Sequence, residues 1–254
     1  IVKKYKNFTI PLTTDTVFEE ETENITVPSV VREIINRGGK TTRTLTLGGF
    51  SIPSKVFMAF LGIYLSDGYV TKNRNGNAGI IGLCKYKPKK VKLIRRILES
   101  MGVRYKYAGG SFIIHSVPLA EFLKPIGNVY DKHIPLWVKN LGRKNLKVLI
   151  HYLLLCDGHI SIRKTSVFGA KEKTQVRKTF YTVSPKLADD LQEIILKTGG
   201  YATIYTNPEK IYTIRGKSGI SKKSYNVHVL KSKTTNILRK NITIEDFTRM
   251  VYDV

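Results

Sequence analysis

The sequence predicts an α+β protein built from two similar halves, with two apolar helices packed together at its centre. From Ser54 onward, helical and strand patterns alternate along the chain in the order helix, strands, helix, strands. Two stretches of the first half then return in the second half, in the same order. Because an internal repeat marks a repeated structural unit, we expect a pseudo-twofold molecule.

The first half shows the clearest order of elements. An apolar helix is expected from Ser54 to Leu65, with Ser54 as its N-cap and Gly68 just beyond its end. Pro88 begins a second helix, whose apolar residues recur every three or four positions. Three strands are expected at residues 78–85, 103–108 and 111–115, followed by a short helix at residues 119–123.

The composition of the chain predicts five segments. Residues 1–53 form an N-terminal extension that mixes Thr-rich stretches, an acidic run and two Gly-Gly pairs, a pattern typical of short strands or an arm. The first half spans residues 54–125, and a proline-containing linker spans residues 126–145. The second half spans residues 146–240, and residues 241–254 form a C-terminal tail.

The charge of the chain is strongly positive and unevenly spread. There are 43 Lys and Arg residues against 19 Asp and Glu residues, which gives a net charge of +24. Residues 1–50 hold seven basic and six acidic residues, so almost all of the excess lies in the remaining chain. Such an excess repels itself in a folded protein unless a polyanion neutralises it, and nucleic acid is the leading candidate.

Membrane and secreted classes of protein do not fit the sequence. Its apolar runs, residues 56–65 and 148–156, are far shorter than the ~20 residues that a membrane helix needs. No apolar signal segment follows Ile1. Cys84 and Cys156 provide neither a disulfide framework nor a paired zinc motif. These features predict an intracellular protein, in the cytoplasm or wherever the nucleic acid that it binds lies.

The repeated stretches contain the most informative residues. Phe60–Gly68 reads FLGIYLSDG, and Ile150–Gly158, 90 positions later, reads IHYLLLCDG. Downstream, residues 97–107 are echoed by residues 195–205. Each nonapeptide ends in a small residue, an aspartate and a glycine, so each apolar helix is expected to carry an aspartate at its end.

Packing the two helices together has a chemical consequence. The small residues Ser66 and Cys156 would let the helix ends approach, which places Asp67 beside Asp157. Both carboxylates then lie at helix C-termini, where the helix dipoles are already negative. Like charges held together in this way repel unless a cation binds between them. A hard divalent cation such as Mg²⁺, which takes one or two carboxylates plus phosphate oxygens, fits that requirement.

Both nonapeptides resemble the LAGLIDADG motif, in which the eighth residue is acidic and the ninth is glycine. Two copies at this spacing make the chain similar, over residues 54–230, to single-chain LAGLIDADG homing endonucleases. Residues 134–141 and 181–191 also resemble endonuclease domains of inteins, and residues 251–254 resemble the start of a late block of the intein splicing domain. The resemblance implies two αββαββα halves whose antiparallel sheets form a saddle over the major groove of DNA.

The resemblance also implies an activity. The protein is expected to cleave both strands of double-stranded DNA across the minor groove beneath the paired helices, with Mg²⁺ as its cofactor. Mn²⁺ is expected to substitute for Mg²⁺, and Ca²⁺ to support binding without cleavage. Because both motifs lie on one chain, we expect a monomer that needs no obligate protein partner and no membrane.

Roles for individual residues follow from the same resemblance. The metal-site positions of the two motifs are occupied by Asp67, Gly68, Asp157 and Gly158. Family members often place a Gln or Lys near the metals, and Lys85 occupies that position in the first half, where an electrostatic or water-ordering role is expected. In the second half Thr182, Ser184 and Lys186 compete for the equivalent role, with Lys186 as the basic candidate. The expected catalytic residues are therefore Asp67, Asp157, Lys85 and Lys186.

The chain departs from the family pattern at two motif positions. Tyr152 stands at the third position of the second motif, where the first copy has Gly62, so the helix crossing is expected to be asymmetric or wider there. Leu65 and Leu155 stand at the sixth position, where the family usually has acids but varies. The acids of the eighth position are retained.

DNA contacts are expected from strands, because a two-stranded ribbon fits the major groove and side chains of one face alternate along it. The candidates are polar or basic residues near expected strands and loops, namely Lys72, Arg74, Asn77, Arg104, Lys106, Arg163, Lys164, Arg177, Lys178, Arg215, Lys217, Lys222 and Lys223. The last four belong to a basic hairpin. His159 directly follows Asp157-Gly158 and is a further candidate for a phosphate or water contact.

Two functions of different classes remain open from the sequence. The first is a site-specific homing endonuclease that makes a double-strand break. The second is a non-cleaving nucleic-acid binder on the same fold, either an RNA maturase that assists intron splicing or a transcription regulator. Two repelling acids give no advantage to a pure binder, so Asp67 and Asp157 favour the endonuclease.

Overall fold

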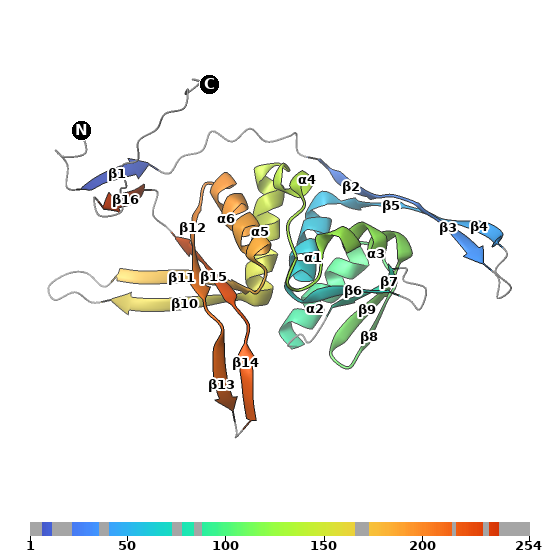
Figure 1. Ribbon diagram of the computed structural model, residues 1–254. Coiled ribbons are helices and arrows are strands. Elements are labelled where there is room, and N and C mark those ends of the chain that lie inside the picture. Colours follow the sequence, from blue (N-terminus) through green and yellow to red (C-terminus); the bar gives the residue numbers. More distant parts are fainter. Residues whose placement is uncertain are drawn as a thin grey trace, which may run out of the picture.

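The computed structural model describes residues 7–11, 22–35, 41–72, 78–83, 88–165, 173–214, 217–230 and 234–238 (Figure 1). Within these residues two four-stranded antiparallel sheets lie on either side of a central pair of helices. None of the helices in the described ranges combines the length and the hydropathy needed to cross a membrane.

The first half contains three helices and one sheet. Its elements, in chain order, are α1 (Ser54–Asp67), β6 (Gly68–Lys72), β7 (Ala78–Leu83), α2 (Pro88–Ser100), β8 (Tyr105–Ala108), β9 (Ser111–His115) and α3 (Val117–Leu123). The strands pair in the order β6-β7-β9-β8, and every pair is antiparallel. The helices expected to begin at Ser54 and Pro88 are confirmed, as are strands within the three ranges expected for them.

The second half repeats this arrangement. Its elements are α5 (Arg143–Asp157), β10 (Gly158–Thr165), β11 (Lys173–Thr182), α6 (Pro185–Lys197), β12 (Tyr201–Asn207) and β15 (Ser224–Leu230). The strand order β10-β11-β15-β12 is the same path through the sheet as in the first half. Any final helix of an αββαββα order would fall after residue 238, outside the described residues.

A projecting hairpin is inserted into the second half. The strands β13 (Lys210–Ile214) and β14 (Lys217–Ser221) pair with each other between β12 and β15. Figure 1 shows this hairpin extending away from the helices, on the side where the two central helices end. The basic hairpin expected from the sequence is therefore present, although its tip, which includes Arg215, lies outside the described residues.

Within the N-terminal extension, where the sequence indicates short strands or an arm, residues 24–35 and 41–53 form a long ribbon (Figure 1). Strand β2 (Asn24–Val27) pairs with β5 (Phe50–Pro53), and β3 (Val30–Ile35) pairs with β4 (Thr41–Leu47). The base of the ribbon belongs to the hydrophobic core, where Ile25, Val27 and Ile52 are buried with α1. Two further strands, β1 (Asn7–Pro11) and β16 (Thr234–Leu238), pair with each other near the two chain ends (Figure 1).

The start of α1 differs from the expectation in one detail. Ser54 is the first helical residue rather than the N-cap, which is Pro53, and no side chain caps this end. The backbone N–H of Ser54 instead donates to the carbonyl of Glu23, 2.8 Å away. This bond satisfies one of the N–H groups that have no partner within the first turn of the helix.

The linker between the halves is compact. It contains the short helices η2 (Lys124–Ile126) and α4 (Leu136–Lys139), separated by a loop at residues 127–135. The aromatic rings of Phe57, Phe122 and Trp137 pack together with centroids 5.8–6.1 Å apart, which joins the linker to the first half. The linker then reaches α6 through Lys139, whose ammonium lies 2.9 Å from Asp190.

Candidate active site at the ends of two paired helices

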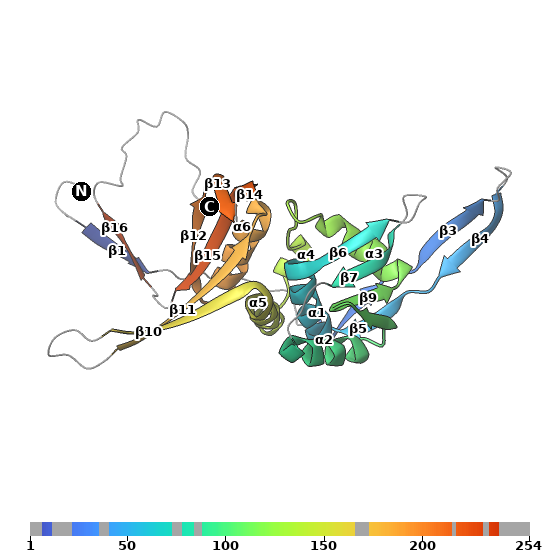
Figure 2. The same ribbon diagram turned by 90° about the horizontal axis from the view of Figure 1, so that it is seen from below.

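The helices α1 and α5, here called the motif helices, pack directly against each other. Their ends lie side by side between the two sheets, as the view from below shows (Figure 2). The pairing predicted from the repeated nonapeptides is therefore present, and it brings the last residue of each helix, Asp67 or Asp157, to the centre of the molecule.

The helix crossing is asymmetric. A Cβ atom added to Gly62 would lie 2.7 Å from the Cβ of Tyr152 and 3.1 Å from the carbonyl oxygen of Leu149. The absence of a side chain at Gly62 therefore makes room for Tyr152, which occupies the same motif position on the other helix. One glycine permits the close approach, and the asymmetric crossing expected from Tyr152 is what the structure shows.

Glycine also ends both motif helices and begins the strand that follows. A Cβ on Gly68 would lie 2.6 Å from the carbonyl oxygen of Tyr64, and one on Gly158 would collide with the carbonyl of Leu154. Each glycine lets the chain leave the helix directly into β6 or β10, with extended backbone angles. The two aspartates are thereby fixed at the junction between helix and sheet.

The two acids share one electrostatic environment. Burial raises the pKa of Asp67. Burial and then the negative charge of Asp67 raise the pKa of Asp157, whereas a hydrogen bond from Ser66 lowers it, and the resulting pKa is about 6. The carboxylates are therefore close enough to repel each other, as the sequence predicted.

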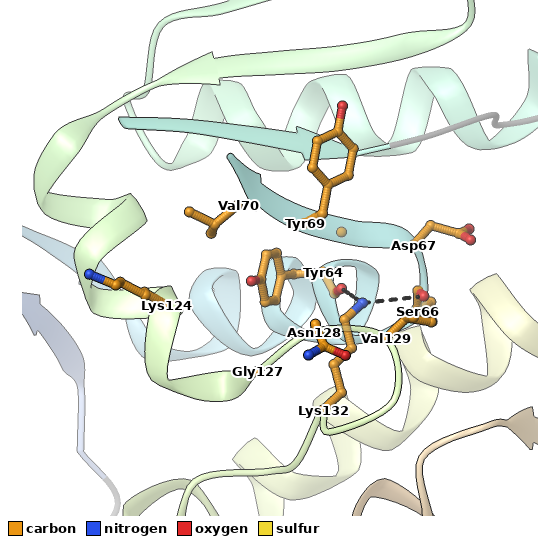
Figure 3. Close-up of a pocket in the computed structure, with 11 residues that line it drawn as sticks. Tyr64, Ser66, Asp67, Tyr69, Val70, Lys124, Gly127, Asn128, Val129 and Lys132 are labelled. Atoms are coloured by element: carbon orange, nitrogen blue, oxygen red, sulfur yellow. Dashed lines mark hydrogen bonds between the residues drawn. The ribbon is translucent and has the colours of Figure 1, made fainter. Parts of the chain in front are cut away.

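Two lysines that the sequence analysis did not single out reach the ends of the motif helices. The ammonium of Lys132 donates to the carbonyls of Tyr64 and Leu65, 2.9 and 3.1 Å away, and lies 3.5 Å from that of Ser66 (Figure 3). The ammonium of Lys90 donates to the carbonyl of Cys156, 2.7 Å away. Both positive charges lower the pKa values of Asp67 and Asp157.

A pocket opens beside each acid. Asp67 lines a pocket of about 690 Å³ together with Tyr64, Tyr69 and Lys124 (Figure 3). Asp157 lines a smaller pocket of about 240 Å³, which Thr182 also lines. The two pockets share Ser66, Val129 and Lys132, so the linker loop lies between them.

The other residues expected in catalysis are placed differently. Lys85 lies outside the described residues. Lys186 is exposed in the first turn of α6 and lines a different pocket, with Asp189 and Asp190, which contains neither Asp67 nor Asp157. Ser184 caps α6, and Thr182 is the one of the three competing residues that lines the pocket of Asp157. The roles of Lys85 and Lys186 stay predictions.

The sheet of the second half has one apolar face and one polar face. Phe180 and Val227 are buried on the side covered by α5 and α6. Since side chains alternate along a strand, the neighbouring positions lie on the opposite side, here called the polar face. Its described side chains are Tyr201, which is buried, and His159, Ser161, Arg177, Thr179, Tyr181, Thr203, Tyr205, Asn207, Ser224, Asn226 and His228.

Hydrogen bonds organise this polar face. The Thr179 hydroxyl lies 2.7 Å from Nδ1 of His228, whose ring also meets Tyr205 edge-on with centroids 5.0 Å apart. The Asn207 amide donates to Asn226, 3.0 Å away. Burial and the charge of Arg177 lower the pKa of His228, which favours the neutral form of the ring. The result is an ordered array of uncharged donors and acceptors next to exposed Arg177.

The corresponding face of the first sheet has a different chemistry. Tyr69 lies across Gly82 on the next strand, because a Cβ at Gly82 would collide with the Tyr69 ring. Exposed Ile80 and Lys106 lie on the same face. The two sheets therefore present unlike surfaces on the side where the motif helices end.

The expected DNA-binding residues fall into three groups. Arg74, Asn77 and Arg215 lie outside the described residues. Only the backbone is described for Lys72, Arg163, Lys164 and Lys217, which lie in strands β6, β10, β10 and β14. The side chains of Arg104, Lys106, Arg177, Lys178, Lys222 and Lys223 are exposed.

Not all of these exposed side chains lie on one surface. Arg177 is on the polar face, but Lys178, one residue later, is on the opposite face, where it lines a pocket with Ile150 and Leu154 of α5. Lys222 lies 4.0 Å from the ring centroid of Tyr130 in the linker loop. The basic hairpin is thereby connected to the loop beside the two acids.

The described residues fit a hard divalent cation. Asp67 and Asp157 present carboxylate oxygens from two helix ends, and the repulsion between them is relieved when a cation binds. The described residues hold no cluster of three or more His, Cys, Asp and Glu side chains, the arrangement that a structural zinc site requires. A carboxylate pair leaves the remaining coordination positions to main-chain oxygens, water and phosphate, which is the usual environment of Mg²⁺.

Solved structures similar to this chain are LAGLIDADG proteins. Mesophilic variants of the homing endonuclease I-DmoI match with a TM-score of 0.45 and 11% identity, over 70% of this chain and 89% of that chain. The homing endonuclease I-WcaI bound to its DNA recognition sequence matches with a TM-score of 0.38 and 11% identity, over 69% and 76%. The N-terminal LAGLIDADG domain of DUF199/WhiA matches with a TM-score of 0.38 and 8% identity, over 69% and 74%.

No protein-family model matches the sequence, and no curated protein sequence matches it significantly. The chain's own architecture nevertheless defines its fold. Two nonapeptide motifs end two paired helices, and each helix leads into an antiparallel sheet with the same strand order. This is a LAGLIDADG-type fold, as the sequence predicted.

Proposed function

We propose that the protein is a site-specific homing endonuclease that makes a metal-dependent double-strand break in a long DNA target by phosphodiester hydrolysis. The observation that carries this proposal is the electrostatic coupling of Asp67 and Asp157 at the ends of two paired helices. A protein that only binds nucleic acid gains nothing from two half-buried acids that repel each other. A protein that holds a divalent cation against a phosphate requires such acids.

In this proposal Asp67 and Asp157 hold Mg²⁺, with main-chain oxygens of Gly68 and Gly158 beside them. The bound cation would polarise the scissile phosphate, activate water and stabilise the leaving oxygen. The chain's own part is to hold the two carboxylates at fixed positions, which the glycine junctions and the helix pairing achieve. Lys85 and Lys186 remain candidates for a lysine that orders water or stabilises developing charge.

DNA binding would use the face on which the motif helices end. The polar face of the second sheet offers uncharged hydrogen-bonding groups, as base edges require, and Arg177 lies among them. The net charge of +24 would supply the phosphate contacts that give affinity without reading sequence. Because the first sheet presents Tyr69 and Ile80 instead, the two halves of the target would differ in sequence.

The direct test is to select cleaved sequences from a random DNA library with Mg²⁺ present, and then to assay Asp67→Asn and Asp157→Asn on the selected target. Each change removes charge at the metal but leaves the basic surface intact, so cleavage should be lost while DNA affinity stays within a few-fold. Cleavage at the wild-type rate by either variant would contradict the site. A collapse of affinity would show that the acids are structural.

Metal binding can be tested without cleavage. A ligand that binds only the folded protein stabilises it in proportion to RT ln(1 + [L]/Kd), so Mg²⁺ or Ca²⁺ should raise the melting temperature of the wild type. The same ions should leave the melting temperature of the Asp67→Asn, Asp157→Asn double variant unchanged. An equal rise in both proteins would place the ions elsewhere. Stable binding of DNA without cleavage, or tighter binding of structured RNA, would favour the non-cleaving function.

A further inference from the structure

The two lysines at the motif helix ends connect the halves of the molecule. Lys90 belongs to α2 of the first half, yet its ammonium bonds the carbonyl of Cys156 at the end of α5, in the second half. Lys132 belongs to the linker, and its ammonium bonds carbonyls at the end of α1, in the first half. Ser66 and Cys156, whose carbonyls these lysines contact, occupy the same position in the two motifs.

The backbone around Lys132 is fastened to the second half. The hydroxyl of Ser184, at the start of α6, donates to the carbonyl of Lys132, 2.6 Å away. Two residues later, the N–H of Ile134 donates to the carboxylate of Asp190 on α6, 2.7 Å away. Lys132 thus reaches from a support on the second half to the helix of the first half. Lys90 reaches in the opposite direction.

Lys132 holds its ammonium against the end of α1, in the wall shared by the pockets of Asp67 and Asp157. Its residue surface is only 4% exposed, and its ammonium lies 5.3 Å from the ring centroid of Tyr64. The three N–H groups of an ammonium match the three carbonyls of Tyr64, Leu65 and Ser66 that surround it. These carbonyls belong to the last turn of α1, where the carbonyl of Tyr64 also accepts from the N–H of Gly68. The last carbonyls of a helix lack the i+4 partners that the helix interior provides, so a lysine can satisfy them.

We propose that Lys132 and Lys90 form a reciprocal clamp, in which each lysine positions the end of the motif helix of the opposite half. The clamp is needed because two helix C-termini and two carboxylates that lie together repel one another. A positive charge bonded to each end offsets that repulsion and fixes both ends relative to the two sheets. In the endonuclease function proposed above, on which this role rests, Lys132 is the positioning residue for Asp67. Lys90 is the positioning residue for Asp157.

The test is strand-resolved cleavage by Lys132→Met and Lys90→Met, with the two DNA strands labelled separately. If each lysine positions one acid, each variant should slow cleavage of one strand by about tenfold to a hundredfold, the cost of a small misplacement of a reacting group. The affected strand should differ between the two variants, while DNA affinity stays within a few-fold. Opposite strand preferences are a result that general destabilisation does not produce.

A control variant removes a nearby charge without touching the end of a motif helix. Lys92→Met removes an exposed lysine on α2, the helix that carries Lys90. It should keep the wild-type ratio of strand cleavage. If Lys132→Met and Lys90→Met slow both strands equally, the lysines act through their charge alone and the clamp is wrong.

A further variant of Lys132 separates the effect of its charge from the effect of its hydrogen-bond geometry. Lys132→Arg keeps the charge, but the planar guanidinium cannot converge on three carbonyls as an ammonium does. It should therefore show the same strand preference as Lys132→Met. A wild-type strand ratio for Lys132→Arg would overturn the positioning role.

Amide hydrogen exchange tests the clamp independently of cleavage. Lys132→Met should speed exchange selectively in residues 64–68, and Lys90→Met in residues 154–158. Unchanged exchange at both ends would overturn the clamp even if cleavage changed. If the wild type cleaves no DNA, the endonuclease function fails, whereas the exchange measurement still decides whether the lysines hold the helix ends.

Discussion

At the scale of single residues, ionisation of Asp157 lowers the stability of the folded, metal-free protein. Burial and the charge of Asp67 raise its pKa from 3.8 to about 6, so the folded state resists ionisation. The unfolded chain ionises near pH 4, so stability falls as pH rises from about 4 to about 6, and the loss is complete above the folded pKa. The candidate site therefore lowers the stability of the folded protein above about pH 6, because it holds Asp157 in its charged form.

This gives a prediction for Asp157→Asn. At pH 7.5 without divalent ions, the variant should be more stable than the wild type by about 2 kcal/mol, a value that allows for solvent screening of a partly buried group. The gain should disappear near pH 4, where the wild-type carboxyl is protonated in both states. Urea unfolding at both pH values measures this difference.

The matched control for this prediction is Asp189→Asn, which changes an exposed aspartate on α6. It should leave the free energy of unfolding unchanged within about 0.5 kcal/mol, as is usual for surface substitutions. Equal effects of the two variants, or a less stable Asp157→Asn protein at pH 7.5, would show that Asp157 is not a strained acid.

Sequence reasoning found the two acids but not the two lysines. Asp67 and Asp157 are marked by a repeat, because each ends an apolar helix before a glycine. Lys90 and Lys132 are two among 43 basic residues, and nothing in their immediate sequence distinguishes them. Lys132 acquires its role only when the linker folds back onto the end of α1, a contact between residues 66 to 68 positions apart.

At the scale of elements, the crossing of the motif helices depends on Gly62. Alanine has the better intrinsic helix propensity by about 1 kcal/mol, yet its Cβ would lie 2.7 Å from that of Tyr152. We therefore expect Gly62→Ala to destabilise the protein by about 1–3 kcal/mol, as overpacking of a core does. Thermal unfolding measures the change.

A second substitution makes the cause of this effect identifiable. Tyr152→Gly removes the Cβ that a methyl group added at Gly62 would meet, so the pair Gly62→Ala and Tyr152→Gly should be less destabilising than the sum of the two single changes. Additive effects would show that the loss caused by Gly62→Ala arises elsewhere, for example from the backbone of Leu153 or Leu149.

The elements that sequence reasoning could assign are those that pack in the core. The helix at Ser54 is a continuous apolar run, because residues 57–65 are buried on all sides. The helix at Pro88 and the strands around Phe112 and Ile114 carry a periodic apolar pattern, since one side packs in the core. The ribbon of residues 24–53 does not, because beyond its base it exposes residues on both sides, including Val31 and Leu45. A strand without a buried face lacks the alternation by which strands are detected.

At the scale of the whole molecule, the charge predicts how binding depends on salt. Contacts to many phosphates release counterions, so log K should fall with log[salt] by about 0.9 for each neutralised phosphate. With +24 on the chain, several such contacts are expected and the slope should be steep. Fluorescence anisotropy with a labelled duplex between 50 and 200 mM salt measures this slope. Over that range the affinity of a protein that contacts several phosphates falls by about 10³–10⁵-fold. A flat dependence would exclude duplex DNA as the main partner.

The asymmetric crossing also makes the two halves complementary to each other. If the second half paired with a copy of itself, Tyr152 would stand where the crossing now has Gly62, and the two tyrosines would be overpacked. If the first half did so, neither helix would present a side chain at this position. The halves produced as two separate chains are therefore expected to associate with each other rather than with their own copies.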